Sequence, residues 1–254
     1  MARLEIQVAG GDTSTALNLE KRLHLIRDFG GPIRDKRIID CGCGAGEYVR
    51  ALGEFGARAF GIEFQRSKLL DSRIEESSRP VTVSAADIQK MPFRDGAFEL
   101  ALVNEVLEHV PDDLRGLREV RRVLKPGGLV IVFSPNRLYP FETHGVYWKR
   151  SGRRVPHYVP GIPYLPLGIG RIWFRYWARN YWPWELKRLL VRAGFELLRG
   201  SFVWQTFENI SGHQPWVVGR TSSFLRLAAN ALERIPGLRS FGASQMLLAR
   251  RPAT

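Results

Sequence analysis

Ile38-Ile39-Asp40-Cys41-Gly42-Cys43-Gly44-Ala45-Gly46 is the most informative segment of this sequence. An apolar run ends in an acid, and three alternating glycines then lead into a helix-like segment that begins at Glu47. This order of strand, glycine turn and helix lets a ligand lie against bare backbone at the carboxyl end of a parallel strand. Glycines suit such a turn because they tolerate positive φ and carry no Cβ to block the ligand. The stretch therefore predicts a site for a nucleotide-like ligand.

Hydrophobic segments with strand and helix character alternate around this turn. The predicted strands cover residues 37–41, 58–63, 81–85, 98–104, 129–133, 195–202 and 244–249. The predicted helices cover residues 17–29, 47–55, 66–76, 112–124, 184–193 and 221–235. This alternation predicts one α/β domain with a Rossmann-like, doubly wound, mostly parallel sheet. Residues 137–182 break the pattern, and we expect them to form a lid-like insertion within that single domain.

Short polar and glycine-rich segments predict where some of these elements begin and end. Asp12-Thr13-Ser14 and Thr221-Ser222-Ser223 are expected to cap the first and last helices, because their side-chain oxygens can accept hydrogen bonds from free backbone N–H groups. Lys125-Pro126-Gly127-Gly128 is expected to end the fourth helix before the fifth strand begins.

Length and composition favour a globular protein. The 254 residues are 44% hydrophobic and 25% charged, which is typical of a folded α/β domain. No apolar stretch is long enough to predict a transmembrane helix, and the first residues do not resemble a signal peptide, so we expect a cytoplasmic protein. Cys41 and Cys43 are too few for a disulfide framework, and no further residues suggest a metal site with them.

Acids follow three successive predicted strands. Asp40 ends the first, Glu63 ends the second, and Asp87 lies just past the third. An acid after the second strand can accept hydrogen bonds from both ribose hydroxyls. Asp87 could accept from an adenine amino group and Asp40 could meet a ligand amine, with Phe64 and Ile88 beside the ring. Each acid alone could equally be a solvated loop carboxylate, but three at successive strand ends favour a binding site.

The glycine turn differs from two common nucleotide motifs. A dinucleotide-binding fingerprint would place a glycine at position 47, where this chain has Glu47. The sequence also lacks the G-x-x-x-x-G-K-[ST] pattern of P-loop ATPases. The sequence therefore argues against a nicotinamide enzyme and against an ATPase.

Several ordered motifs together resemble class I S-adenosylmethionine-dependent methyltransferases of the small-molecule type. They are Ile38–Gly46, Glu63, Ala86-Asp87-Ile88, Phe98–Val110 and Leu124-Lys125-Pro126-Gly127-Gly128. The resemblance covers roughly residues 35–136, together with Ala193-Gly194-Phe195. It implies a seven-stranded sheet whose last strand is antiparallel, with S-adenosylmethionine as the cofactor.

The resemblance also implies which residues bind the cofactor. The glycine turn would pass its methionyl part, the acid after the second strand would hold the ribose, and the acid after the third would contact adenine. The residues implied are Asp40, Gly42, Cys43, Gly44, Gly46, Glu63, Phe64, Asp87, Ile88, Asn104 and Glu105.

The segment Asn104–Val110 further resembles ubiquinone-type O-methyltransferases, and it contains His109. A hydroxyl acceptor needs a base as its proton leaves, and imidazole suits that task near neutral pH. His109 is either this base or, as we favour, a structural histidine behind the pocket. His144 and His157 are further candidates, with Glu142 as an orienting or basic group. We hypothesise that a histidine after the fifth strand is the base.

The insertion combines aromatic and basic residues. Residues 138–184 contain 13 aromatic side chains, and residues 137–199 hold 12 Lys/Arg against three acids. A lid that packs its aromatic rings on the pocket explains this composition for any acceptor. The composition also suits an anionic membrane surface, with residues 165–174 at the interface, which favours a small, lipid-like or lipid-linked acceptor.

Two other functions remain open at this point. The basic aromatic segment could stack on bases and neutralise phosphates, as in an RNA methyltransferase, although no RNA-binding module is recognisable. The chain could also be a non-catalytic subunit with the methyltransferase fold. We expect methyl transfer to a hydroxyl and rank RNA second among acceptors, while the sequence does not predict the oligomeric state.

Overall fold

The computed structural model describes residues 16–70, 74, 77, 79–156, 158–207 and 216–253. The predicted helix cap at Asp12-Thr13-Ser14 lies outside these residues.

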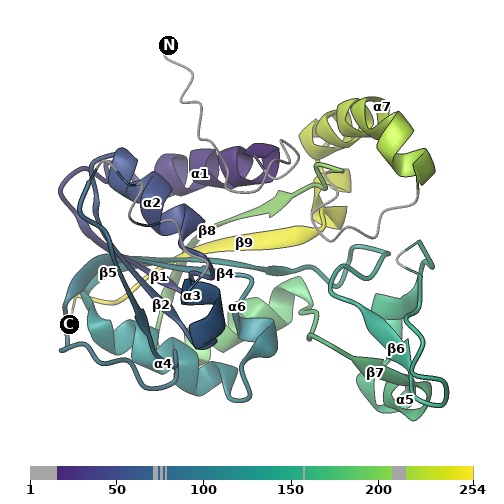
Figure 1. The fold of residues 1–254 in the computed structure, drawn as a ribbon, viewed down its shortest axis with the longest axis horizontal. Coiled ribbons are helices and arrows are strands. Elements are labelled where there is room, and N and C mark those ends of the chain that lie inside the picture. The colour runs from purple at the N-terminus through teal and green to yellow at the C-terminus, as the bar shows by residue number, and fades with distance from the viewer. Residues whose placement is uncertain are drawn as a thin grey trace.

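A seven-stranded sheet forms the centre of the molecule (Figure 1), in the order β3-β2-β1-β4-β5-β9-β8. Neighbouring strands pair in parallel except β9, which is antiparallel to both β5 and β8. This mixed, mostly parallel sheet with an antiparallel last strand confirms the predicted fold class. The strands are β1 (Arg37–Cys41), β2 (Arg58–Glu63), β3 (Thr82–Ala85), β4 (Phe98–Asn104), β5 (Leu124–Pro135), β8 (Glu196–Val203) and β9 (Ser244–Arg250).

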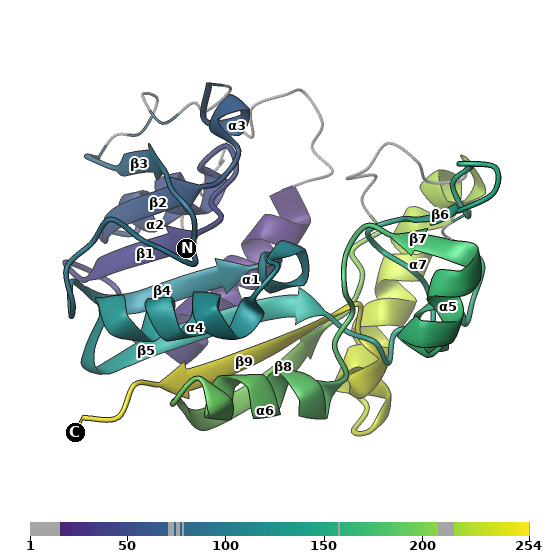
Figure 2. The same ribbon diagram turned by 90° about the horizontal axis from the view of Figure 1, so that it is seen from below.

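Helices cover both faces of the sheet. Figure 1 shows α1 (Ala16–Gly30) and α2 (Glu47–Glu54) above the sheet, and Figures 1 and 2 show α4 (Asp113–Val123) and α6 (Pro183–Arg192) on the opposite face. The remaining helical segments are α3 (Arg66–Leu70), α5 (Leu167–Trp173), α7 (Trp216–Arg234) and the short 3-10 turns η2 (Leu107–His109), η3 (Ile162–Tyr164) and η4 (Leu238–Phe241).

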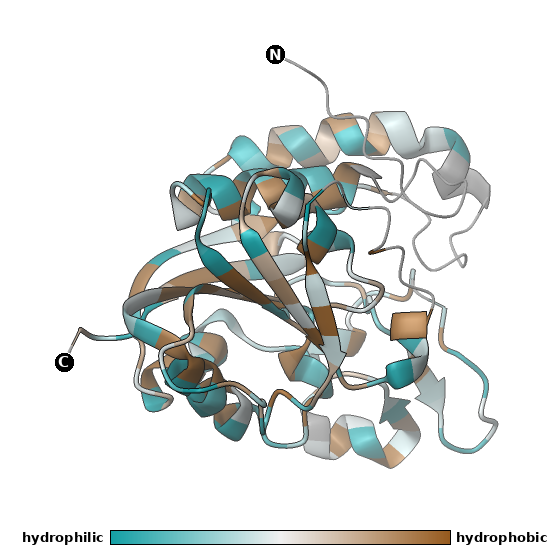
Figure 3. Ribbon diagram, turned by 60° about the vertical axis from the view of Figure 1, so that its left-hand side comes forward, coloured by the Kyte–Doolittle hydropathy of each residue, from teal (hydrophilic) through white to brown (hydrophobic). Residues whose placement is uncertain are grey.

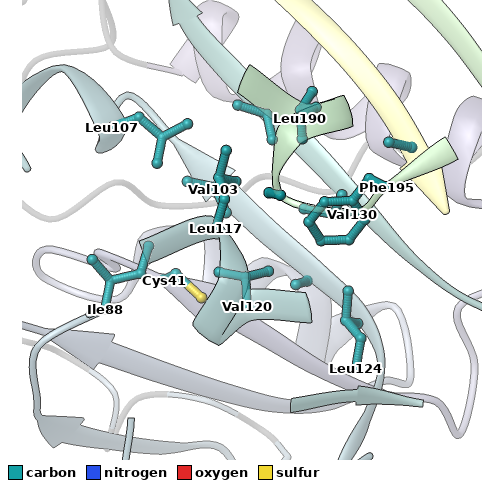
Figure 4. Close-up of a cluster of buried hydrophobic side chains, with 14 of the residues drawn as sticks. Cys41, Ile88, Val103, Leu107, Leu117, Val120, Leu124, Val130, Leu190 and Phe195 are labelled. Carbon is teal, nitrogen blue, oxygen red and sulfur yellow. The ribbon is translucent and has the colours of Figure 1, made fainter. Parts of the chain in front are cut away.

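Two hydrophobic clusters hold the layers together, one on each face of the sheet. The first joins α4 and α6 to the strands through residues such as Leu117, Leu190 and Val130 (Figure 4). The second joins α1 and α2 to the other face, with Ile26 and Leu52 fully buried. In Figure 3 hydrophobic residues follow the central strands, while the helices alternate between hydrophobic and hydrophilic residues. The sheet is therefore buried on both faces, as expected for parallel strands.

Some element boundaries differ from the predictions. The predicted cap at Thr221-Ser222-Ser223 is wrong, because α7 already begins at Trp216 and these residues lie inside the helix. Serine and threonine are favoured at helix starts but also occur inside helices at a small cost, so their presence alone does not mark the start of α7. β5 begins at Leu124 and not at Leu129, and a register shift against β4 between Phe98 and Leu100 accommodates the extra residues.

Residues 137–182 form a small lobe with a core of its own. β6 (Val146–Trp148) and β7 (Phe174–Tyr176) pair antiparallel, and Val146, Val155, Ile162 and Phe174 pack together. Arg137 ties the start of the lobe to its middle and its end, because its guanidinium donates to the Pro163 and Leu165 carbonyls (both 2.6 Å) and its N–H to the Tyr181 carbonyl (3.0 Å). Among the described residues, no helix combines the length and apolarity needed to cross a bilayer.

Candidate active site

The glycine turn connects β1 to α2 with all three glycines in the left-handed region. Gly42, Gly44 and Gly46 have φ values of 87°, 54° and 86°. A Cβ on Gly42 would lie 2.4 Å from Cγ2 of Val106, whereas one on Gly44 would meet nothing within 4 Å. Gly42 therefore permits close contact with the segment after β4, while Gly44 faces open space. That open space is what a cofactor lying on bare backbone requires.

Asp40 is a buried carboxylate at the end of β1. It is 1% exposed, and its Oδ1 atom has no hydrogen-bond partner among the described residues. Burial, together with the nearby charge of Glu63, raises the pKa of Asp40 to about 7. A buried charge is costly unless it is paired, so Asp40 suits a cationic group on a ligand.

Glu63 is held in place by main-chain donors at the end of β2. Its Oε2 accepts from the Gly44 N–H (3.0 Å) and its Oε1 accepts from the Gln65 N–H (2.9 Å). These bonds fix the carboxylate beside the glycine turn and leave lone pairs for hydroxyl donors. The neighbouring Cys43 is buried, and burial also raises the pKa of its thiol. Because a Cβ on Gly61 would lie 2.7 Å from the Cys43 sulfur, the Cys43 side chain packs against β2.

Asp87 and Ile88 lie after β3, where the sequence predicted them. Asp87 is half-buried and accepts from the Gln89 N–H at 2.8 Å, while Ile88 is buried. Phe64 is 75% exposed and so offers a free ring surface.

Asn104 and Glu105, at the end of β4, bind a residue that the sequence did not predict for the site. Arg22 of α1 is buried and donates to Asn104 Oδ1 and to Glu105 Oε1 (2.8 Å). Ser244 of β9 also donates to Glu105 Oε1 at 2.6 Å. Burial would raise the pKa of Glu105, but the charges of Arg22 and His144 hold it below its ordinary value. The only signal for Arg22 in the sequence is a cation among the apolar residues of the first helix.

The structure brings three of the four predicted catalytic residues together. His144 Nε2 lies 3.4 Å from Glu108 Oε1 and 3.8 Å from Glu105 Oε2, and the His109 and His144 ring centroids are 5.3 Å apart. Glu142 is buried and accepts from the His144 N–H (3.1 Å) and the Asn180 side-chain amide (2.8 Å). His157 lies outside the described residues. Glu108, for which the sequence predicted no role, also belongs to this group. Glu105, Glu108, His109 and His144 together form a carboxyl–imidazole cluster.

The groups of the carboxyl–imidazole cluster shift each other's proton affinity. Burial, helped by the charge of Glu105, raises the pKa of Glu108 to about 8 despite the opposing effect of His144. Burial alone would lower the pKa of His144, but Glu108 and Glu105 raise it above the ordinary histidine value. Partial enclosure of its ring and the charge of His144 lower the pKa of His109. The lowered pKa of the exposed His109 thus favours its neutral imidazole at neutral pH, beside a buried Glu108 and a half-buried His144 that share a proton.

The same cluster also contains donor atoms suited to a divalent metal ion. Glu108, His109 and His144 each offer one ligand atom, and these atoms lie within 4.8 Å of one another. Two imidazoles and a carboxylate form a donor set that first-row transition metals accept. The arrangement can therefore either move a proton or bind a metal, and these two roles differ in their response to chelation.

The C-terminal end of the lobe contacts the segment after β4, which carries most of the cluster. The Arg179 N–H donates to the Glu108 carbonyl (3.2 Å), and the Arg179 side chain pairs with Asp113 of α4 at 2.9 Å. The Tyr181 hydroxyl lies 3.1 Å from the Leu107 carbonyl and 2.9 Å from Asp113 Oδ2. Residues from both ends of the lobe therefore surround the segment after β4.

The fold and the glycine turn define the class of protein. Residues 39–132 match the family model of a methyltransferase domain. The seven-stranded sheet has the strand order of the class I methyltransferase fold. The chain therefore contains a class I S-adenosylmethionine-dependent methyltransferase domain, and S-adenosylmethionine is the methyl donor of that family. The unpartnered Asp40 oxygen, the fixed Glu63 carboxylate and the open space at Gly44 fit that cofactor.

The curated relatives match only part of this chain. The chain is 31% identical over 119 residues to the ubiquinone biosynthesis O-methyltransferase of Bordetella avium, which covers 46% of this chain and 49% of that protein. It is 35% identical over 136 residues to sterol 4-C-methyltransferase strm-1 of Caenorhabditis elegans, covering 50% of this chain and 39% of that one. The chain thus spans about half or less of the length of these curated relatives.

Solved structures show the same fold at lower identity. An S-adenosylmethionine-dependent methyltransferase from Mesorhizobium loti matches with a TM-score of 0.61 and 21% identity, over 92% of this chain and all of that one. The PH0226 protein from Pyrococcus horikoshii matches with a TM-score of 0.62 and 15% identity, over 95% of this chain and 92% of that one. Because they cover more than nine-tenths of this chain, these likenesses extend beyond residues 39–132.

Proposed function

We propose that this protein transfers a methyl group from S-adenosylmethionine to a hydroxyl of a small, lipid-like acceptor. The main support for this proposal is that the carboxyl–imidazole cluster lies next to the glycine turn. β1 and β4 are neighbours in the sheet, and Val106 lies where a Cβ on Gly42 would be. A cofactor beside Gly44 would thus lie close to groups that can accept the acceptor's proton.

The residues at the ends of β1, β2 and β3 are proposed to hold the cofactor. Asp40 would pair with its ammonium group, Glu63 would accept hydrogen bonds from its ribose hydroxyls, and Asp87 would accept from its adenine amine. Phe64 and Ile88 would lie beside the adenine ring, with Gly42, Cys43, Gly44 and Gly46 along the methionyl part and Asn104 and Glu105 near the reacting end. When bound, the cofactor supplies an electrophilic methyl group. The protein then has to align the acceptor oxygen with it and exclude water.

His109 is the proposed general base. A general base has to reach the acceptor and has to be unprotonated. His109 meets both conditions, because it is exposed and its pKa is lowered. His144 is half-buried beside two carboxylates, so we assign it a positioning role: with Glu108 it would fix the His109 ring and balance the charge after proton transfer. Glu142 would in turn fix the main chain at His144.

The lipid-like acceptor is supported by the lobe and by the relatives. Trp173 and Trp177 of the lobe are 52% and 66% exposed, and Trp177 lies two residues before Arg179, whose N–H donates to the Glu108 carbonyl. Such exposed rings suit an apolar acceptor. The two curated relatives named above are, by their names, an O-methyltransferase of ubiquinone biosynthesis and a sterol 4-C-methyltransferase, and both ubiquinone and sterols are lipids. The described residues offer no comparable support for a nucleic-acid acceptor.

Mass spectrometry of cell extracts tests the proposal. Deletion of the protein should cause a species lighter by one methyl group to accumulate in the organic phase. Wild-type protein should restore the methylated form, whereas the matched variant His109→Asn should not. A methyl-deficient species found in the RNA fraction would replace the lipid-like acceptor by RNA, and no changed species in either fraction would favour a non-catalytic subunit.

A further inference from the structure

α7 carries an apolar stripe on its exposed side. Phe224 and Leu227 are 72% and 70% exposed, Ala231 is exposed, and Ile235 directly after the helix is 45% exposed. Their spacing of three, four and four residues places them on one face of a helix. Leu238 and Phe241 of η4 extend the exposed apolar surface beyond the helix end.

This stripe is separate from the side that α7 packs against the protein. Ala229 is buried, Leu225 and Leu232 are half-buried, and Glu233 forms an ion pair with Lys21 of α1. In the helical projection these residues lie on the side opposite Phe224 and Leu227. Core packing therefore explains one side of α7 and leaves the other unexplained. A contiguous exposed apolar surface of this kind marks an interaction site.

The charges around the stripe identify the chemistry of its partner. Residues 220–241 contain Arg220, Arg226, Arg234 and Arg239, and their only acid is Glu233. Arg220, Arg234 and Arg239 are exposed, whereas Arg226 is half-buried on the side of α7 that faces α1. Because Glu233 is already paired with Lys21, the described surface around the stripe is positively charged. Apolar side chains bordered by arginines suit the boundary between headgroups and acyl chains of an anionic membrane.

A second apolar element lies toward the same end of the molecule. On α5, Ile169, Ile172 and Trp173 are 49%, 63% and 52% exposed, and Arg171 between them is exposed as well. Both Figure 1 and Figure 2 show α5 and α7 at the end toward which β5 runs, which is also the end that carries the candidate active site. Two elements distant in the sequence thus present the same combination of apolar and basic side chains.

We propose that α7, together with α5, docks this protein on an anionic phospholipid surface. A second copy of the chain would bind this face less well, because two identical faces would bring arginines against arginines, and the part of this face that the structure describes offers no unpaired acid to balance them. The docking goes beyond methyl transfer and does not depend on it, so each can be tested without the other. It would place the active site next to the phase in which a lipid-like acceptor resides.

Vesicle flotation tests the docking in the absence of cofactor and acceptor. The full-length protein should float with vesicles of phosphatidylcholine and phosphatidylglycerol, and binding should fall at least tenfold with pure phosphatidylcholine or at high salt. The double variant Phe224→Ser/Leu227→Ser should bind the anionic vesicles at least tenfold more weakly. The control Val191→Ser removes a side chain on α6 that is 55% exposed and should leave binding unchanged.

Several outcomes would overturn the docking proposal. Wild-type protein that stays unbound, or a double variant that floats as well as wild type, would contradict it. A wild-type dimer that becomes monomeric in the double variant without any vesicle binding would assign the stripe to a second copy. Unchanged thermal unfolding and S-adenosylmethionine binding of the double variant would show that its fold is intact.

Discussion

The two sides of the candidate site are built in different ways. The cofactor side comes from residues 40–88. Its carboxylates are fixed by nearby main-chain N–H groups: those of Gly44 and Gln65 hold Glu63, and that of Gln89 holds Asp87. The acceptor side joins the segment after β4 to Arg22 of α1, Ser244 of β9 and His144 of the lobe. The first side depends on backbone geometry, whereas the second depends on tertiary contacts between side chains.

This difference assigns separate tasks to the two sides. The main chain at three neighbouring strand ends can hold a cofactor that stays the same whatever the acceptor is. Side chains from distant elements can be exchanged to suit different acceptors, so the acceptor side is where chemistry and specificity reside. Variants on the acceptor side should therefore spare cofactor affinity, while variants that enter the cofactor space on the cofactor side should lower it.

The largest effect is expected for His109→Asn. Loss of the proposed base should lower turnover about 100-fold or more, with S-adenosylmethionine affinity unchanged. Wild-type turnover should rise with pH, and the midpoint of this rise should lie at a pKa below that of an ordinary histidine. The variant should lose this pH dependence. The measurement is release of S-adenosylhomocysteine with total lipid extract as the acceptor source. His24→Asn, on the exposed side of α1, is the control, and full turnover by His109→Asn would refute the assignment.

Arg22→Met should have the next largest effect, on stability. The variant leaves Glu105 without its cationic partner, and breaking a buried ion pair on one side costs about 3 kcal/mol of unfolding free energy. Arg27→Met, on the same helix but exposed, should cost well below 1 kcal/mol. Urea denaturation of both variants measures the difference. Equal losses would show that Arg22 contributes only packing and that the acceptor side is not held by this ion pair.

Gly42→Ala and Gly44→Ala compare two glycines within the cofactor side. The first puts a Cβ against Val106 in a left-handed residue and should destabilise the protein by about 2–4 kcal/mol. The second meets open space and should cost only about 1–2 kcal/mol for its positive φ. Gly44→Ala should nevertheless weaken S-adenosylmethionine binding, because the new methyl group occupies the proposed cofactor space. Denaturation and calorimetry together would show whether the two effects separate in this way.

Chelation should have the smallest effect. If the carboxyl–imidazole cluster moves a proton, dialysis against EDTA should change turnover less than about twofold, because Glu108 and His144 already balance each other's charge. A loss of turnover that zinc or manganese restores would make Glu108, His109 and His144 metal ligands, and the role of His109 as base would then be withdrawn.

The cofactor side could be predicted from the sequence because its signals are local. A glycine turn needs particular residues at adjacent positions, and strand-end acids follow directly from strands that alternate with helices. The residue Arg22 could not be placed, since its partners lie 83 and 222 positions away. Glu108 was passed over because its importance comes from burial beside His144. The predicted start of α7 was wrong because serine and threonine also occur inside helices, where they cost little.

Calorimetric titration of S-adenosylmethionine at pH 6 and pH 8 tests the claim that Asp40 and the glycine turn bind this cofactor. Without cofactor the pKa of Asp40 is raised to about 7, so Asp40 binds protons that an unfolded aspartate would release. Its carboxylate must lose that proton to pair with an ammonium group. The affinity of the wild type should therefore rise about tenfold from pH 6 to pH 8 relative to Asp40→Asn. The variant should bind weakly at both values. Wild-type protein that fails to bind, or an Asp40→Asn variant with the same affinity and pH dependence, would contradict the claim.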